Sequence, residues 1–389
     1  MKFVFFDIDG VLLQPAGYRK AVRDTLQSLA DQAQIETQPM DEEIPALFES
    51  YGITSEWDML AISFAILLEF YCRITGKQVP GQTVEAVLSG LANGEPVSIQ
   101  PDYRRDIVTL AEIARLEETP SLSIFHHLRD SDFPALGRQA ILADIFCHTR
   151  SVNKSYITRL FQNLVLGDDL FTKTYGRPVV HPTQSYLETY DVSLLNETNQ
   201  QWIKSAIAQH SHYFAGLTAR PSLGPHGYAD PELTAYSPEA ELALRVIGLE
   251  EMHLLGYGRL QFEASKMGID ADALLKPDPY HTIAAIYACI YDDEQKGLEM
   301  ASKILRHSHG TIDFSELTKP MELVIFEDSP GGILSVQSAA RLLQDNGIPV
   351  NTIVYGVTDN PDKMKSLEKI GAKLFPNVND ALQNYLTKV

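Results

Sequence analysis

The sequence predicts an α/β protein with a Rossmann-like parallel sheet core and a large all-helical domain. Short apolar runs at 2–6, 212–217 and 322–326 end in polar residues, as buried parallel strands do. Strands and helices alternate after residue 322, whereas residues 17–209 show helical periodicity almost throughout. A chain of 389 residues also exceeds the usual size of one hydrophobic core. We therefore expect two domains.

The elements of the predicted core follow in order along the chain. The run Lys2 to Phe6 reads as a buried strand that delivers two carboxylates at its end, in Asp-Ile-Asp-Gly. The second strand ends at Thr218, and the third ends in Glu327-Asp328. After these come a helix from about 331, a strand at 352–357, a helix at 362–370, a strand at 373–375 and a helix from about 379. The expected helices before the second strand are 55–74, 82–91, 102–116, 135–149 and 193–208.

This pattern predicts the domain boundaries. Residues 1–14 and 206–389 form the α/β core, and residues 15–205 form an all-helical insertion. The insertion begins directly after the Asp-rich turn. Because ligands bind at the carboxyl ends of parallel strands, we expect the insertion to act as a cap over the site.

Composition excludes several classes of function. The net charge of −19, without a Lys/Arg block, argues against nucleic acid and anionic membranes as partners. Cys72, Cys147 and Cys289 lack CxxC spacing, which argues against a disulfide framework or a zinc site. The longest apolar run, about 59–71, is too short to span a bilayer, and no signal peptide is evident. We expect a cytoplasmic protein.

Two acidic segments carry the strongest chemical signal. Alternation along a strand points Asp7 and Asp9 to the same side, where they suit a nucleophile paired with an acid/base group, or a hard cation. Glu327 and Asp328 are costly to place together unless a cation binds between them. Each segment also has a structural explanation, as an Asp-Gly turn or as the start of a helix.

Two further segments supply cations and donors. Lys276, followed by two prolines in Lys-Pro-Asp-Pro-Tyr, is a point charge suited to a phosphate oxygen, although most lysines are simply solvated. Thr218, Ala219 and Arg220 offer a hydroxyl and backbone donors at a strand end, where a β-branched residue is also common. The four segments occur in a fixed order on successive elements, which favours one joint site.

These segments resemble the motifs of the haloacid dehalogenase superfamily. The matching stretches are FFDIDGV, GLTARP, KPDPY and VIFEDSPGG, and the tail GVTDNPDKMKSLEKIGAKLFPNVNDAL resembles the last strand-helix repeats of that fold. The resemblance covers the whole core, and within the cap it is limited to short fragments. The spacings from Thr218 to Lys276 and from Lys276 to Glu327 are longer than usual, with insertions at 222–236 and 281–320.

The resemblance implies a role for each matching residue. Asp7 would be the nucleophile and Asp9 the general acid/base, with Thr218 and Lys276 holding the phosphoryl oxygens. Asp7, the Asp9 backbone carbonyl, and Glu327 or Asp328 would bind Mg²⁺. This agrees with the need to neutralise a transferring phosphoryl group before a carboxylate approaches it.

The resemblance also narrows the reaction. Branches with dehalogenase or phosphonatase activity lack an aspartate at the place of Asp9, so we expect a Mg²⁺-dependent phosphatase that acts on a small phosphorylated metabolite, a sugar or polyol phosphate by analogy. A phosphomutase and a non-catalytic protein that binds phosphorylated ligands remain as alternatives. We expect substrate contacts from Thr218, Ala219, Arg220 and Lys276 in the core, and from Trp57 and Asp58 in the cap, where Trp57 also has a packing explanation.

Overall fold

The chain forms two compact units in the computed structural model, which describes residues 1–115, 119–129, 132–137, 140–306, 314, 317 and 319–387. Unit 1 consists of Met1–Pro15, Asp191–Asp230 and Ala235–Val389. Unit 2 consists of Ala16–Tyr190 and Pro231–Thr234. The predicted insertion at 281–320 contains residues that lie outside the described ones.

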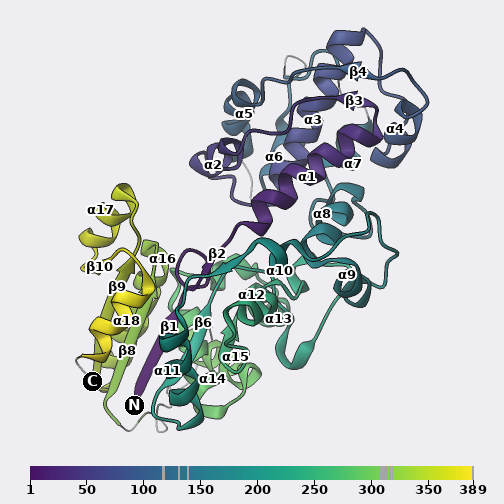
Figure 1. Cartoon of the computed structure of the whole chain (residues 1–389). Coiled ribbons are helices and arrows are strands. Elements are labelled where there is room, and N and C mark those ends of the chain that lie inside the picture. Colours follow the sequence, from purple (N-terminus) through teal and green to yellow (C-terminus); the bar gives the residue numbers. More distant parts are fainter. Residues whose placement is uncertain are drawn as a thin grey trace. The chain divides into compact units, whose positions relative to one another are not determined.

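Unit 1 is built on a sheet of six parallel strands within the described part of the chain, in the order β10-β9-β8-β1-β6-β7. Figure 1 shows β1 between β6 and β8. The strands that follow β1 in the chain lie first on one side of it (β6, β7) and then on the other (β8, β9, β10). The carboxyl end of β1 is therefore the topological switch point of the sheet. The strands are β1 (Lys2–Phe6), β6 (Tyr213–Leu217), β7 (His253–Leu255), β8 (Met321–Glu327), β9 (Val350–Val357) and β10 (Lys373–Phe375).

Helices cover both faces of this sheet. Alternation along β1 sends Phe3 and Phe5 into one buried cluster, and Val4 and Phe6 into another. The first cluster contains side chains of α13, α14, α15 and α16, and the second contains side chains of α11, α12 and α18. The result is a three-layer α/β arrangement. The helices are α11 (Glu197–Ala208), α12 (Glu239–Ile247), α13 (Tyr257–Met267), α14 (Pro279–Tyr291), α15 (Glu294–Leu305), α16 (Pro330–Asp345), α17 (Pro361–Lys369) and α18 (Val378–Leu386).

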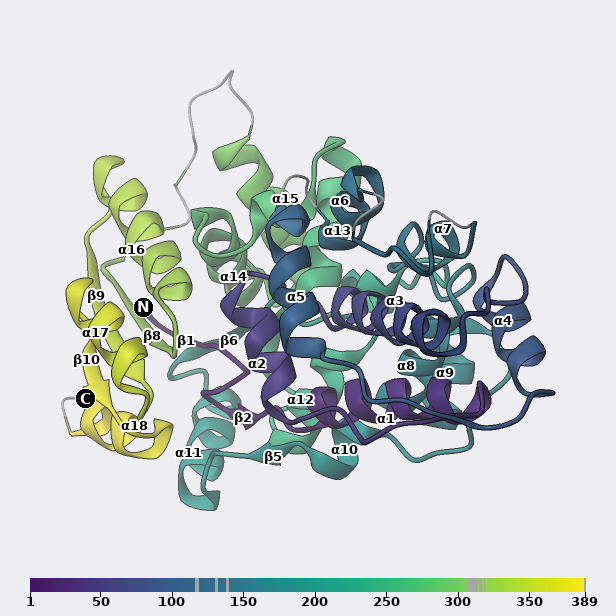
Figure 2. The same cartoon turned by 90° about the horizontal axis from the view of Figure 1, so that it is seen from above.

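Unit 2 is predominantly helical. Its helices α1, α3 and α8 pack against one another, and Figure 2 shows α1 and α3 running alongside each other. The prediction of an all-helical domain needs a correction, because β3 (Ile35–Glu36) and β4 (Val97–Ser98) form a short parallel pair. The helices are α1 (Gly17–Gln32), α2 (Glu43–Ser50), α3 (Glu56–Thr75), α4 (Val84–Leu91), α5 (Tyr103–Ala111), α6 (Pro120–His127), α7 (Ala140–Phe146), α8 (Tyr156–Leu166), α9 (Asp168–Tyr175) and α10 (Tyr186–Tyr190).

The boundary between the units differs from the one expected at residue 205. Unit 1 begins again at Asp191, and residues 231–234 belong to unit 2. Two contacts explain the earlier return to unit 1. Strand β5 (Val192–Ser193) pairs antiparallel with β2 (Leu13–Gln14), and α11 buries Ile203 against the sheet. Helical periodicity identifies α11 but does not say which unit it packs against.

Two further features concern the length of the helices and the state of the cysteines. None of the described helices is both long and apolar enough to cross a lipid bilayer. Cys72, Cys147 and Cys289 are free thiols, and the first and last of these are buried. The structure therefore contains no disulfide among these three cysteines.

Candidate functional site

The acidic ends of two neighbouring strands form the floor of the site. Asp7 follows β1, and its backbone N–H donates to the Phe326 carbonyl at 3.0 Å, which extends the ladder between β1 and β8 to the strand ends. Glu327 is the last residue of β8 and is completely buried. The parallel register thus places the two carboxylates at the same edge of the sheet, at its switch point.

Lys276 lies between these carboxylates. Its Nζ is 3.0 Å from Oδ1 of Asp7 and 2.8 Å from Oε2 of Glu327. It comes from the loop between a 3₁₀ turn (Ala271–Leu274) and α14, so it reaches the site from a separate element. Ser329 donates from Oγ to the other oxygen of Glu327 at 2.9 Å. Both Glu327 oxygens are therefore engaged by protein donors.

Asp328 completes a group of three carboxylates. Ligand oxygens of Asp7, Glu327 and Asp328 all lie within 4.8 Å of one another. The Asp328 side chain is 15% exposed and pairs with Lys363 at the start of α17. Gly10, at a φ of +77°, makes room for it, because a Cβ there would come within 2.6 Å of Asp328 Oδ2.

The crowding of charge shows in the pKa values. Burial, followed by the charge of Asp7, raises the pKa of Glu327 and the pKa of Asp328 above their ordinary values. Burial alone would lower the pKa of Lys276, but the Asp7 and Glu327 carboxylates outweigh it and raise that pKa. The site is therefore electrostatically unfavourable for its acids, a situation that a bound cation would relieve.

Thr218 is held at the same edge of the sheet by its backbone. It follows β6, whose residue Gly216 pairs with Phe6 of β1. The Thr218 N–H donates to the Leu255 carbonyl at 3.2 Å, and the buried His281 ring contacts the same carbonyl through Nε2 at 2.7 Å. Thr218 Oγ1 accepts the Arg220 N–H at 3.1 Å, which leaves the hydroxyl proton for donation. Ala219 is exposed between them.

The Asp9 carboxylate is paired with an arginine. The Arg220 guanidinium donates to it from Nε, at 2.9 Å to Oδ1 and 2.8 Å to Oδ2. Arg220 also contacts Asp191 through Nη2 at 3.1 Å. Strand alternation predicts that Asp7 and Asp9 point to the same side, and it does not predict this arginine partner.

A glycine at the start of α16 fits tightly against the site. A Cβ on Gly332 would lie 1.7 Å from Oε2 of Glu327, the oxygen that contacts Lys276. Gly332→Ala is therefore expected to displace Glu327 and to lower the free energy of unfolding by about 1–3 kcal/mol. Denaturant unfolding measures this change.

The neighbouring glycine provides a matched control. A Cβ on Gly331 meets no atom closer than 3.8 Å, so Gly331→Ala removes the same backbone freedom without a clash. Equal stability of the two variants would contradict the proposed role of Gly332.

The two candidate residues of the helical domain lie within unit 2. Asp58 is completely buried, and it accepts from Ser121 Oγ at 2.6 Å and from Arg150 Nη2 at 2.7 Å. The expectation of a direct substrate contact by Asp58 is therefore wrong in this structure, because its carboxylate belongs to an internal ion pair. Trp57 is half-buried, with the Arg150 guanidinium 4.9 Å from its ring centroid. This packing agrees with the structural explanation of Trp57.

The structure adds residues that the sequence analysis does not assign. Lys363 pairs with Asp328, Asp191 pairs with Arg220, and Ser329 donates to Glu327. Ser329 lies within the acidic motif, so its neighbours in sequence were a usable signal. Lys363 and Asp191 are reached only through the fold, because nothing in their local sequence marks them.

Comparisons with known proteins identify a fold. No family model matches the chain, and no curated protein matches it. A solved structure, an X-ray structure of a Northeast Structural Genomics Consortium target, is similar over 100% of both chains with a TM-score of 0.65 and 15% sequence identity. At that identity the similarity establishes the α/β fold alone.

Proposed function

We propose that this protein is a Mg²⁺-dependent phosphatase that hydrolyses a small phosphorylated metabolite through a transient phosphate on Asp7. The observation that carries the proposal is the meeting of Asp7, Lys276 and the acidic pair Glu327-Asp328 at the switch point of the sheet. The resemblance of the four segments to haloacid dehalogenase motifs supports the same function. Phosphoryl transfer needs this combination of an anionic nucleophile, a lysine and a cation site.

The residues present fit a magnesium ion. Three carboxylates with oxygens within 4.8 Å of one another are hard donors, which Mg²⁺ prefers. Asp7 and Asp328 would hold the ion together with the Asp9 backbone carbonyl, while Glu327 already accepts from Lys276 and Ser329. When bound, Mg²⁺ would neutralise charge on the phosphoryl oxygens and bring the phosphate to Asp7.

The chemistry assigned to the chain has two steps. Asp7 attacks phosphorus, the ester bond breaks, and Asp9 gives a proton to the leaving oxygen. Asp9 then takes a proton from a water molecule that attacks phosphorus, and the bond to Asp7 breaks to release inorganic phosphate. Lys276 and the Thr218 hydroxyl hold the phosphoryl oxygens in both steps.

Unit 2 is proposed to select the substrate. A core of this type contacts the phosphate and leaves the rest of the molecule to other segments. Unit 2 follows directly after the turn that carries Asp7 and Asp9, at Ala16. We assign to it the role of a cap, with a sugar or polyol phosphate as the proposed class of substrate.

A screen of phosphorylated metabolites with Mg²⁺ tests the function. We expect release of inorganic phosphate from one chemical class, loss of that release to background when EDTA is added, and recovery with excess Mg²⁺. Full activity in EDTA would contradict the cation site. An isomerised product that requires a bisphosphate activator would instead indicate a phosphomutase, and Mg²⁺ binding without turnover of any ester would indicate a binding protein.

A further inference from the structure

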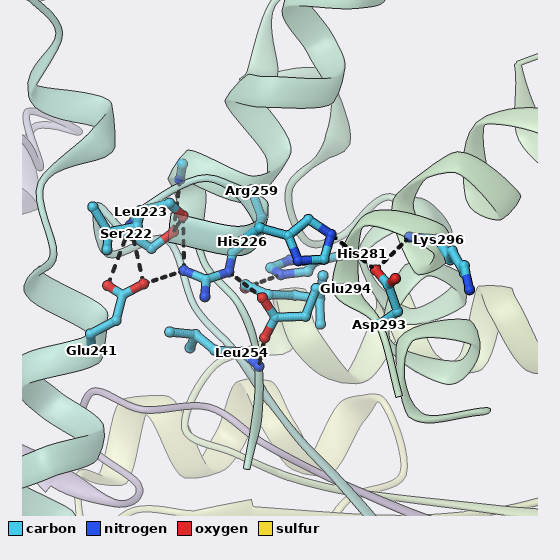
Figure 3. A network of polar contacts seen from close by, with 12 residues as sticks. Ser222, Leu223, His226, Glu241, Leu254, Arg259, His281, Asp293, Glu294 and Lys296 are labelled. Atoms are coloured by element: carbon cyan, nitrogen blue, oxygen red, sulfur yellow. Dashed lines mark hydrogen bonds and ion pairs between the residues drawn. The ribbon is translucent and has the colours of Figure 1, made fainter. Parts of the chain in front are cut away.

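Arg220 extends from a backbone segment that is fixed from several sides. Its carbonyl accepts the Tyr257 N–H at 2.9 Å, and the hydroxyl of Ser222 accepts the Gly258 N–H at 3.1 Å. Figure 3 shows Ser222 and Leu223 beside the Arg259 guanidinium, which donates to the Leu223 carbonyl at 2.8 Å. The start of the Arg220 side chain therefore has little freedom.

The guanidinium of Arg220 joins two carboxylates of unequal burial. Asp9 is 35% exposed and accepts a forked contact from Nε and Nη2, at 2.8–2.9 Å and 2.6 Å. Asp191 is 1% exposed and accepts from the same Nη2 at 3.1 Å. The Arg220 side chain is itself only 2% exposed. A forked guanidinium fixes the orientation of a carboxylate much better than a single donor does.

Asp9 and Asp191 lie on two segments that are also connected by backbone hydrogen bonds. Asp9 precedes β2, and Asp191 precedes β5, which pairs with β2. The Leu194 N–H donates to the Leu12 carbonyl at 2.9 Å and extends this pairing. Arg220 thus spans a small ribbon, with the buried Asp191 at one end and the partly exposed Asp9 at the other.

We propose that Arg220 is a positioning residue for Asp9, anchored by Asp191, and that it does not contact the substrate. The inference rests on the proposed function, because it explains how the acid/base group of that reaction keeps its orientation. Its basis is the fork to Asp9 together with the burial of the guanidinium, which leaves almost no surface for a ligand.

Kinetics of Arg220→Met test this role. We expect kcat to fall about 10-fold to 100-fold with little change in KM, because a displaced acid/base group affects the chemical steps and not binding. The loss is expected to be larger for alkyl phosphates than for p-nitrophenyl phosphate, whose leaving group does not need a proton. Asp191→Asn is expected to show the same pattern to a smaller extent, and Arg220→Lys to recover part of the loss.

A double-mutant cycle with Asp9→Asn gives the decisive measurement. If Arg220 acts through Asp9, Arg220→Met costs little further activity once Asp9→Asn is present. An equal cost in both backgrounds, or a rise in KM at unchanged kcat, would overturn the proposal. Arg341→Met, at an exposed position of α16, is the control for losing an arginine. If Arg220→Met does not fold, Asp191→Asn combined with Asp9→Asn carries the same cycle.

A measurement that does not depend on enzyme activity separates this inference from the proposed function. The NMR signal of the Arg220 Nε–H is expected to be protected from solvent exchange in the wild type and in Asp7→Asn, and to lose protection in Asp9→Asn. Absence of phosphatase activity in the wild type would refute the proposed function. An unprotected Nε–H in the wild type would refute the proposed positioning of Asp9 by Arg220.

Discussion

Asp7→Asn is expected to reduce phosphatase turnover by more than about 10⁴-fold, because an amide cannot form the covalent phosphate that the proposed reaction requires. The substitution changes the shape of the side chain very little. It also removes one of three carboxylates whose oxygens lie within 4.8 Å of one another. We therefore expect the unfolding free energy of the metal-free protein to be unchanged or higher. Steady-state kinetics and denaturant unfolding measure the two effects.

The control for Asp7→Asn is Asp345→Asn, which makes the same chemical change at an exposed position near the end of α16. Wild-type turnover is expected there. Retained activity in Asp7→Asn would reject Asp7 as the nucleophile, whereas a loss of activity together with a loss of folding would leave the variant unsuitable. In that second case Asp7→Glu, which keeps the charge and moves the carboxylate, is expected to abolish turnover in a folded protein.

The sheet was predictable because its strands are short, apolar and followed by polar residues. The run Lys2 to Phe6 alternates between two buried faces, and both faces are filled in the structure. Strand β7 (His253–Leu255) was not expected: it is as short as β10, but it lies outside the regular alternation of strands and helices that marks the end of the chain. The return to unit 1 at Asp191 was also missed, since pairing of β2 with β5 involves two residues from each segment.

The candidate site was predictable where a strand end or a short motif marks its residues. Asp7, Glu327 and Asp328 lie at strand ends, Lys276 stands in the Lys-Pro-Asp-Pro-Tyr motif, and the structure brings the four together. Partners without a local sequence signal were not predictable. Lys363 reaches Asp328 from α17, and the burial of Asp58 depends on how α3 packs within unit 2. These features follow from tertiary packing, which local sequence patterns do not encode.

A second strong effect is expected outside the site, at a partly buried cluster of charges in unit 1. Arg259 on α13 donates from Nε to Glu294 Oε2 at 2.7 Å and pairs with Glu241 on α12. Its side chain is 10% exposed. Glu294 also accepts the Leu254 N–H at 2.8 Å, and Glu241 accepts the Leu223 N–H at 3.1 Å. Figure 3 shows Arg259 between the two acids. This one cation on α13 therefore connects α12 and α15 with strand β7 and the loop after Arg220.

Arg259→Met is expected to lower the free energy of unfolding by about 2–3 kcal/mol, because it leaves two partly buried carboxylates, Glu241 at 26% and Glu294 at 17% exposure, without their cation. Burial already raises the pKa of Glu241, and the charge of Arg259 opposes that rise. Adding Glu241→Gln to Arg259→Met should recover part of the loss by removing one stranded charge. Lys365→Met, which breaks the exposed pair with Asp362, is the control and is expected to change stability very little. If Arg259→Met and Lys365→Met change the free energy of unfolding equally in denaturant, the Arg259 cluster does not hold these elements together.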